Sequence, residues 1–174
     1  ALLALLPGLV HSQNTGRTGL AAAAADEEQE TVIVRRLNDS VGVRFVADKR
    51  ERVLYFFDPR AELVQGDEVE QGPSGQSTVV LSEGGLIQMF AAGHMVIEAL
   101  GREQGGELVD VLRFPLLNTI EVTSLDRKLI CILPGDIQAE LLGGRITIKL
   151  VPGRLRIRND GGSLVRVRGT MTQE

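Results

Sequence analysis

The sequence contains very few aromatic residues. Phe, Tyr and Trp make up 3% of the 174 residues, Trp is absent, and Tyr55 is the single tyrosine. Platforms that stack nucleic-acid bases or sugar rings are built from flat aromatic side chains. The net charge of −4 adds no general attraction to nucleic acid. The composition therefore argues against aromatic binding platforms and against a nucleic-acid partner.

Cysteine and histidine are also scarce. Cys131 is the only cysteine, so no disulfide can form within the chain. Inside the apolar run LICIL we expect this residue to be a buried small hydrophobic side chain. The two histidines, His11 and His94, lie in unrelated segments. Their placement predicts neither a zinc site nor a Ser-His-Asp triad.

Motifs that mark catalytic or metal sites are missing as well. No Walker A, GxGxxG or GxSxG pattern occurs in the chain. The stretch GDEVEQG, residues 66–72, has carboxylates at alternate positions but lacks the Asp-x-Asp-x-Asp-Gly pattern of a calcium loop. We therefore predict that the protein is not an enzyme and has no catalytic residues, no metal site and no cofactor.

The N-terminal segment differs from the rest of the chain. Residues 1–13, ALLALLPGLVHSQ, resemble the apolar and cleavage regions of a secretory signal peptide, although a buried or interfacial helix is the alternative. The apolar run is too short for a transmembrane helix. Residues 14–30 combine an alanine run with an acidic cluster and read as a linker. We expect an extracytoplasmic protein, whether secreted, periplasmic or at the cell surface, and leave open whether the first segment is cleaved.

From Thr31 onward, apolar residues alternate with polar ones in short runs bounded by turn residues. The pattern predicts a single all-β domain over residues 31–174, either an antiparallel β-sandwich or a short β-solenoid of Gly-punctuated hairpins. The predicted strands are residues 31–37, 41–47, 52–58, 77–83, 85–91, 94–100, 107–114, 118–124, 128–133, 136–142, 145–151, 154–160 and 163–169. The predicted inward side chains are Val79, Leu81, Ile87, Val96, Ile120, Val122, Ile130, Ile137, Ile146, Ile148, Leu155 and Ile157.

Three segments of the chain resemble one another. GLIQMFAAGHMVIEAL (85–100) and GDIQAELLGGRITIKL (135–150) align without a gap, and PGDIQAELLGGRI aligns with PGRLRIRNDGGSL in the same way. We expect hairpin repeats near residues 85–100, 134–150 and 152–168. A single hairpin is too small to bury its own apolar face, so these units are expected to stack on one another.

Basic residues are concentrated near the end of the chain, at alternate positions. On a half-buried strand, this spacing places the charged side chains on one face and the apolar ones on the other. The simpler interpretation is a solvated face whose long side chains cover the sheet. The alternative is an assembly or partner surface formed by Arg145, Lys149, Arg154, Arg156, Arg158, Arg166 and Arg168.

Acidic residues outnumber basic ones over residues 26–70, near the opposite end of the chain. An acidic region and a basic region on one chain are complementary. They can satisfy each other within the fold, or they can meet between neighbouring copies in a head-to-tail assembly.

The segment LVQGDEVEQGPSGQSTVVLSEGGLIQMFAAGHMVIEAL resembles the start of a FecR-type domain, an extracytoplasmic all-β module. The resemblance spans about residues 64–171 and rests on Gly66-Asp67, Gly72, Gly75, Gly84-Gly85 and the Val-Arg-Gly-Thr stretch that contains Arg168, Gly169 and Thr170. It implies an extracytoplasmic β scaffold. No helical segment of a cytoplasmic regulator follows before Glu174, so we expect a scaffold rather than a signalling regulator.

Two functional hypotheses follow from the sequence. The first is a secreted or cell-surface structural protein that forms a homo-oligomer or filament through β edges, the N-terminal segment and oppositely charged ends. The second is a monomeric periplasmic FecR-like module that binds or senses a protein or glycan with a concave sheet face. Neither hypothesis involves nucleic acid or a transmembrane helix.

Overall fold

The computed structural model describes residues 30–161 and 164–169, so the signal-like segment and nearly all of the expected linker lie outside the described residues. The all-β fold is confirmed, and it is a sandwich of two packed sheets. No helix in the described part of the chain is long and apolar enough to cross a bilayer. The elements are β1 (Val32–Asn38), β2 (Val41–Phe45), β3 (Arg50–Leu54), β4 (Arg60–Leu63), β5 (Glu68–Gln71), β6 (Gln76–Val80), the 3-10 turn η1 (Ser82–Gly84), β7 (Leu86–Phe90), β8 (Gly93–Gln104), β9 (Glu107–Leu116), β10 (Thr119–Ser124), β11 (Lys128–Leu133), β12 (Ile137–Leu142), β13 (Gly144–Val151), β14 (Arg154–Gly161) and β15 (Leu164–Arg168).

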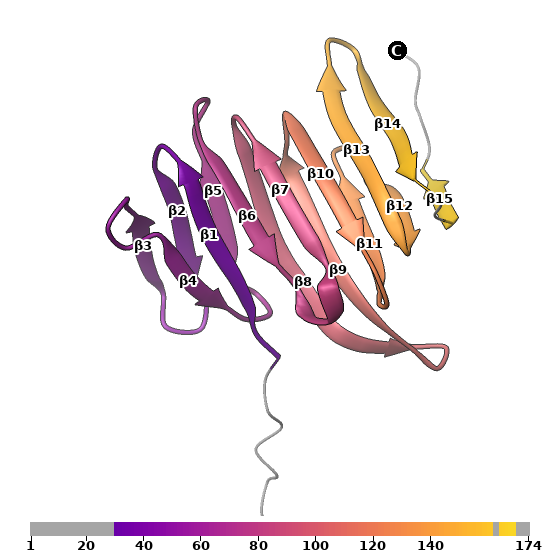
Figure 1. Ribbon diagram of the computed structural model, residues 1–174, viewed down its shortest axis with the longest axis horizontal. Coiled ribbons are helices and arrows are strands. Elements are labelled where there is room, and N and C mark those ends of the chain that lie inside the picture. The colour runs from indigo at the N-terminus through magenta and orange to yellow at the C-terminus, as the bar shows by residue number, and fades with distance from the viewer. Residues whose placement is uncertain (1–29, 162–163, 170–174) are drawn as a thin grey trace, which may run out of the picture.

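The two sheets are packed face to face, and the strands of each sheet succeed one another along the long axis of the molecule (Figure 1). Sheet A has the strand order β14-β13-β10-β7-β6-β1-β4, and sheet B has the order β15-β12-β11-β9-β8-β5-β2-β3. Neighbouring strands are antiparallel except for the parallel pair β9 and β11. Strands β3 and β4 therefore form one end of the sandwich, at the left of Figure 1, and β14 and β15 form the other.

The three similar segments are not hairpins. In residues 85–100, β7 belongs to sheet A and β8 to sheet B, and the other two segments likewise place their two strands in opposite sheets. Each segment is therefore an arch that carries the chain from one sheet to the other. At the corner between β12 and β13, Gly143 and Gly144 have φ of 67° and 96°, a backbone region that glycine adopts without steric cost. At the corner between β7 and β8 the residue with positive φ is Ala91, with φ of 61°, so the same backbone requirement is met there without glycine.

The core lies between the sheets and follows the predicted alternation closely. Ile87, Val122 and Ile148 are fully buried, as expected. Two of the residues predicted to point inward do not belong to the main core. The first is Val96, which is only half-buried and alternates with the buried Met95 and Ile97, so it lies on the outer face of sheet B. Ile130 is buried but belongs to a separate small cluster with Val109 and Ile132, outside the main core.

The predicted strand at residues 52–58 is shorter in the structure. Strand β3 ends at Leu54, and the aromatic residues that follow form a turn. Two hydrogen bonds close this turn: the Tyr55 N–H donates to the Asp58 carbonyl oxygen at 3.2 Å, and the Asp58 N–H donates to the Tyr55 carbonyl oxygen at 3.1 Å. Strands β4 and β5, of four residues each, have no counterpart in the prediction. They are too short to show a convincing alternation.

One buried carboxylate holds the backbone in place immediately before β5. The side chain of Asp67 accepts hydrogen bonds from the Val46 N–H at 2.9 Å and the Val64 N–H at 3.0 Å. The preceding residue, Gly66, has φ of 96°, and its N–H donates to the Ile97 carbonyl oxygen at 2.7 Å. Because buried N–H groups are costly to leave unpaired, this Gly-Asp step has a structural role in holding β5 beside β8.

Candidate functional site

The seven predicted basic residues lie at one end of the molecule, which we call the basic end, but on two different faces. The outer face of sheet A carries five of them, and the outer face of sheet B carries the other two. The first group is Arg145, Lys149, Arg154, Arg156 and Arg158, and the second is Arg166 and Arg168. The structure therefore divides the predicted surface into two rows on either side of the core.

Some of these charges are neutralised locally. Arg145 pairs with Glu121, Arg158 pairs with Asp160, and Arg168 lies 3.4 Å from Glu140. Hydrogen bonds from Thr147 and Arg158 lower the pKa of Asp160, so this carboxylate stays ionised.

Other charges at the basic end lack a counter-charge. Lys149 and Arg156 are direct cross-strand partners, and like charges in that arrangement repel. Within the described residues, neither side chain makes an ion pair, and the same holds for Arg154 and Arg166. The basic end therefore has unbalanced positive charge on both of its outer faces.

The core reaches the basic end without a covering element in the described residues. Strands β14 and β15 are the last strands of their sheets. Leu155, Ile157 and Val165 pack against the main core but remain only partly buried. An edge strand presents a row of backbone N–H and C=O groups that a further strand can pair with. This end therefore combines unpaired sheet edges, exposed apolar surface and positive charge.

The end formed by β3 and β4 is less acidic than the sequence predicts. Residues 26–28 of the acidic region lie outside the described residues. Asp48 pairs with Arg50, and Asp58 pairs with Arg52. Most acidic side chains in this region are therefore balanced within the chain rather than presented to a partner.

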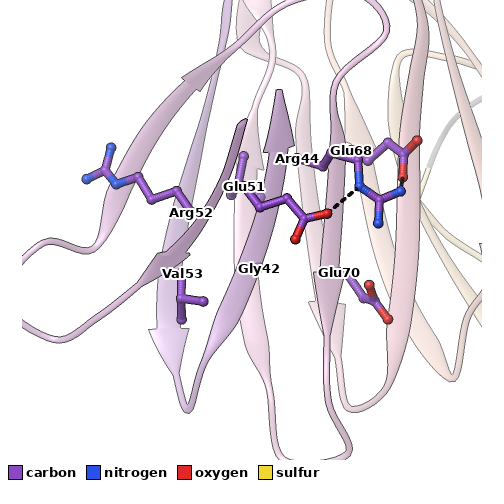
Figure 2. A pocket seen from close by; sticks show the side chains of 8 residues that line it. Gly42, Arg44, Glu51, Arg52, Val53, Glu68 and Glu70 are labelled. Atoms are coloured by element: carbon purple, nitrogen blue, oxygen red, sulfur yellow. Dashed lines mark hydrogen bonds and ion pairs between the residues drawn. The ribbon is translucent and has the colours of Figure 1, made fainter. Parts of the chain in front are cut away.

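Carboxylates remain in excess on the outer face of sheet B at this end. Figure 2 shows the guanidinium of Arg44 between the carboxylates of Glu51 and Glu68, at 3.0 Å and 3.1 Å. Beside them, Gly42 has no side chain and leaves a hollow of about 160 Å³ between Val53 and Glu70. An added Cβ at Gly42 would lie 3.6 Å from the Glu70 carbonyl oxygen, an ordinary van der Waals contact, so a side chain at this position could enter the hollow.

A buried ionic cluster lies near the turn between β10 and β11. Arg127, whose side chain is 8% exposed, pairs with Glu30, with Glu83 at 3.2 Å and with Asp110 at 3.1 Å. Burial raises the pKa of Asp110, although the Gly101 N–H and Arg127 donate hydrogen bonds that oppose this effect. Burial would lower the pKa of Arg127, but its bonds to the three carboxylates raise the pKa above the ordinary value.

Sequence reasoning did not find this cluster. One signal was present: Asp110 has the same parity on β9 as the buried Leu112 and Phe114, so alternation places a carboxylate inside the sandwich. The three carboxylates are far apart in the chain, and only the tertiary fold brings them to Arg127. The cluster joins the segment before β1 to the middle of the molecule, which indicates a structural role.

The scarce reactive residues have clear environments. Cys131 is fully buried, as expected, and burial raises the pKa of its thiol to about 12. His94 lies on β8, and its Nε2 is 3.0 Å from Glu68. Among the described residues, no group of three or more His, Cys, Asp or Glu side chains is arranged to hold a metal ion.

A scan against models of known protein families, a search of curated proteins and a search of solved structures each found no match to this chain. The resemblance to FecR-type domains therefore stays a prediction from the sequence.

Proposed function

We propose that this protein is a non-catalytic structural protein, secreted or at the cell surface, that assembles head to tail through the two ends of its sandwich. The observation that carries this proposal is the pair of open ends: β14 and β15 at one end, and β3 and β4 at the other, are the last strands of both sheets in the described residues.

Unpaired sheet edges favour association. When β14 and β15 of one copy lie beside β4 and β3 of the next, both sheets continue across the contact. The new main-chain hydrogen bonds do not depend on side-chain identity. The partly buried Leu155, Ile157 and Val165 lose their remaining exposure, which adds a hydrophobic contribution.

Charge disfavours a symmetric contact between two basic ends and supports the head-to-tail contact on sheet B. A symmetric contact between two basic ends would place Arg154 and Arg156 of one copy against the same residues of the other, which is repulsive. In the head-to-tail contact, Arg166 and Arg168 at the end of sheet B approach Glu51 on β3, which is also in sheet B. Contacts of this heterologous kind continue into filaments unless the rotation closes a ring.

The test is the mass of the full chain in solution. Sedimentation velocity at low salt should show a weight-average mass that rises with protein concentration and falls when salt is added, because salt screens the charge pairing. A monomeric mass at every concentration would overturn the proposal.

A matched pair of variants tests the contribution of charge. Arg166→Gln with Arg168→Gln should weaken association about tenfold at low salt, since rim charges contribute modestly to affinity. Gln76→Glu with Gln88→Glu changes the net charge equally but lies on β6 and β7, far from both ends, and should have little effect. Equal effects of the two variants would show that only net charge matters.

A monomeric binding module is the second candidate function, and the hollow at Gly42 favours it. Carboxylates around the hollow suit a basic peptide side chain or the hydroxyl groups of a glycan. Gly42→Val should leave the fold intact, because β-branched residues favour strands, and should fill the hollow. Loss of chemical-shift changes on titration with an oligosaccharide or a Lys-rich peptide would support this function. Unchanged binding by the variant would place the binding site elsewhere.

A further inference from the structure

The turn after β3 gathers half of the aromatic side chains of the chain. Five Phe and one Tyr are present in total, and Tyr55, Phe56 and Phe57 are consecutive. Phe56 and Phe57 are 86% and 85% exposed. In a protein with so few aromatic residues, two neighbouring phenylalanines in water point to a surface that becomes buried in a complex.

The turn holds its rings in a fixed arrangement. The rings of Tyr55 and Phe57 stack with a centroid separation of 5.7 Å and an interplanar angle of 9°. Two backbone hydrogen bonds between Tyr55 and Asp58 close the turn, and Arg52 pairs with Asp58 below it. Little conformational entropy is therefore lost when the stacked Phe57 ring is buried against a partner.

The turn lies at the extreme end of the molecule. It joins β3 of sheet B to β4 of sheet A, so the chain passes across the end of the core rather than over an outer face. Figure 1 shows this connection at the left extremity of the long axis, opposite to β14 and β15.

We infer that the aromatic turn anchors one copy in the next, with Phe56 and Phe57 entering between β14 and β15 of a second copy. This inference rests on the proposed head-to-tail assembly and names the contact that holds it. The acceptor is apolar in its middle, where Leu155, Ile157 and Val165 are only partly buried. Aromatic side chains that become buried at the centre of an interface are typical hot spots.

The arginines around the acceptor suit aromatic rings as well. A guanidinium over a ring face is favourable, and the arrangement already occurs in this chain, where Arg50 lies 5.2 Å from the centre of the Phe45 ring. Arg154, Arg156 and Arg166 alternate with the partly buried apolar residues of β14 and β15 and point to the outer faces, so they lie at the rim of the acceptor.

A membrane is a poorer partner for the turn. Two of the arginines beside it are neutralised, since Arg50 pairs with Asp48 and Arg52 pairs with Asp58, and only Arg60 follows the turn without an ion pair in the described residues. Arg154, Arg156 and Arg166, which would also attract anionic lipid, lie at the opposite end of the long axis, so a flat bilayer cannot contact them together with the turn. A second copy of the chain can contact both.

The first test compares two double variants of the full chain. Phe56→Ser with Phe57→Ser should weaken association about 100-fold while leaving the thermal unfolding temperature nearly unchanged, because both side chains are exposed. Leu108→Ser with Leu116→Ser removes exposed apolar side chains from β9, in the middle of sheet B, and should leave association unchanged. If wild type associates and the Phe variant associates equally well, the anchor is wrong and the proposed assembly stands. If wild type stays monomeric, both are wrong.

The second test locates the contact. A photo-reactive benzoylphenylalanine in place of Phe57 should cross-link to residues 154–157 or 164–168 of a second copy, identified by mass spectrometry. Cross-links between two aromatic turns would overturn the inference in favour of a symmetric contact. Cross-links to lipid in phosphatidylglycerol vesicles, without cross-links between chains, would overturn it in favour of a membrane.

Discussion

Replacing Arg127 by methionine is expected to lower the free energy of unfolding by about 3–5 kcal/mol, the usual cost of leaving a buried charge without its partner. The guanidinium is 8% exposed, and the Asp110 side chain that it contacts is 3% exposed. Methionine keeps much of the volume but donates no hydrogen bond to the carboxylates. Urea unfolding followed by circular dichroism measures the change.

The loss should depend on pH in a defined direction. Because the pKa of Asp110 in the folded protein is raised above its ordinary value of 3.8, its contribution to stability falls as pH rises from that value through the folded pKa. Without Arg127 the folded pKa rises further. The deficit of the variant should therefore be small near pH 4 and largest at neutral pH, and a deficit that shrinks as pH rises would contradict the assignment.

An exposed arginine provides the matched control. Arg113 also pairs with two carboxylates, Glu98 and Asp136, but its side chain is 39% exposed. Arg113→Met should cost less than about 1 kcal/mol, because ion pairs at the surface contribute little. If Arg127→Met and Arg113→Met lowered the free energy of unfolding equally, the stabilising effect of the cluster would not come from its burial.

Replacing Ile148 by aspartate is expected to cost about 4–5 kcal/mol or to prevent folding. The side chain is fully buried on β13, between Ile120 on β10 and Ile157 on β14. Aspartate there removes apolar volume and places a carboxylate where no cation can reach it. Because this variant can fail to fold, Ile148→Val gives a measurable step of about 0.5–1.5 kcal/mol.

The neighbouring residue tests the alternation on β13. Lys149 is exposed on the outer face of sheet A, so Lys149→Asp should change the unfolding free energy by no more than about 0.5 kcal/mol. The same chemical group one position away is then tolerated. If both aspartate variants were equally unstable, the two faces of β13 would be misassigned.

The sequence predicted the core well wherever only one face of a strand is apolar. Ile146 and Ile148 alternate with Arg145 and Thr147, so their direction was clear. The assignment failed at Val96 because Met95, Val96 and Ile97 are all apolar, and alternation cannot select one parity. Register shifts between β8 and β9 in this region make the choice depend on tertiary structure.

The topology could not be obtained from the sequence, for a physical reason. A hairpin and an arch both need a tight corner with residues at positive φ, so a Gly-Gly pair between two strands is compatible with either. The prediction of one basic surface failed for the same reason, because it needed to know which sheet each strand belongs to. Alternation showed that Arg156 and Arg166 point outward, but only the assignment of β14 and β15 to different sheets separates them.

The arches also determine how the molecule can change in length. Each arch carries the chain to the opposite sheet, so the sandwich grows by adding strands to both sheets as the chain proceeds along the long axis. Removal of the unit formed by β14 and β15 would shorten each sheet by one strand and leave β13 and β12 as the new ends. Duplication of that unit would lengthen both sheets equally. The length of this fold is therefore set by the number of such units, because neither sheet closes on itself. Both sheets gain or lose the same number of strands when whole units are added or removed.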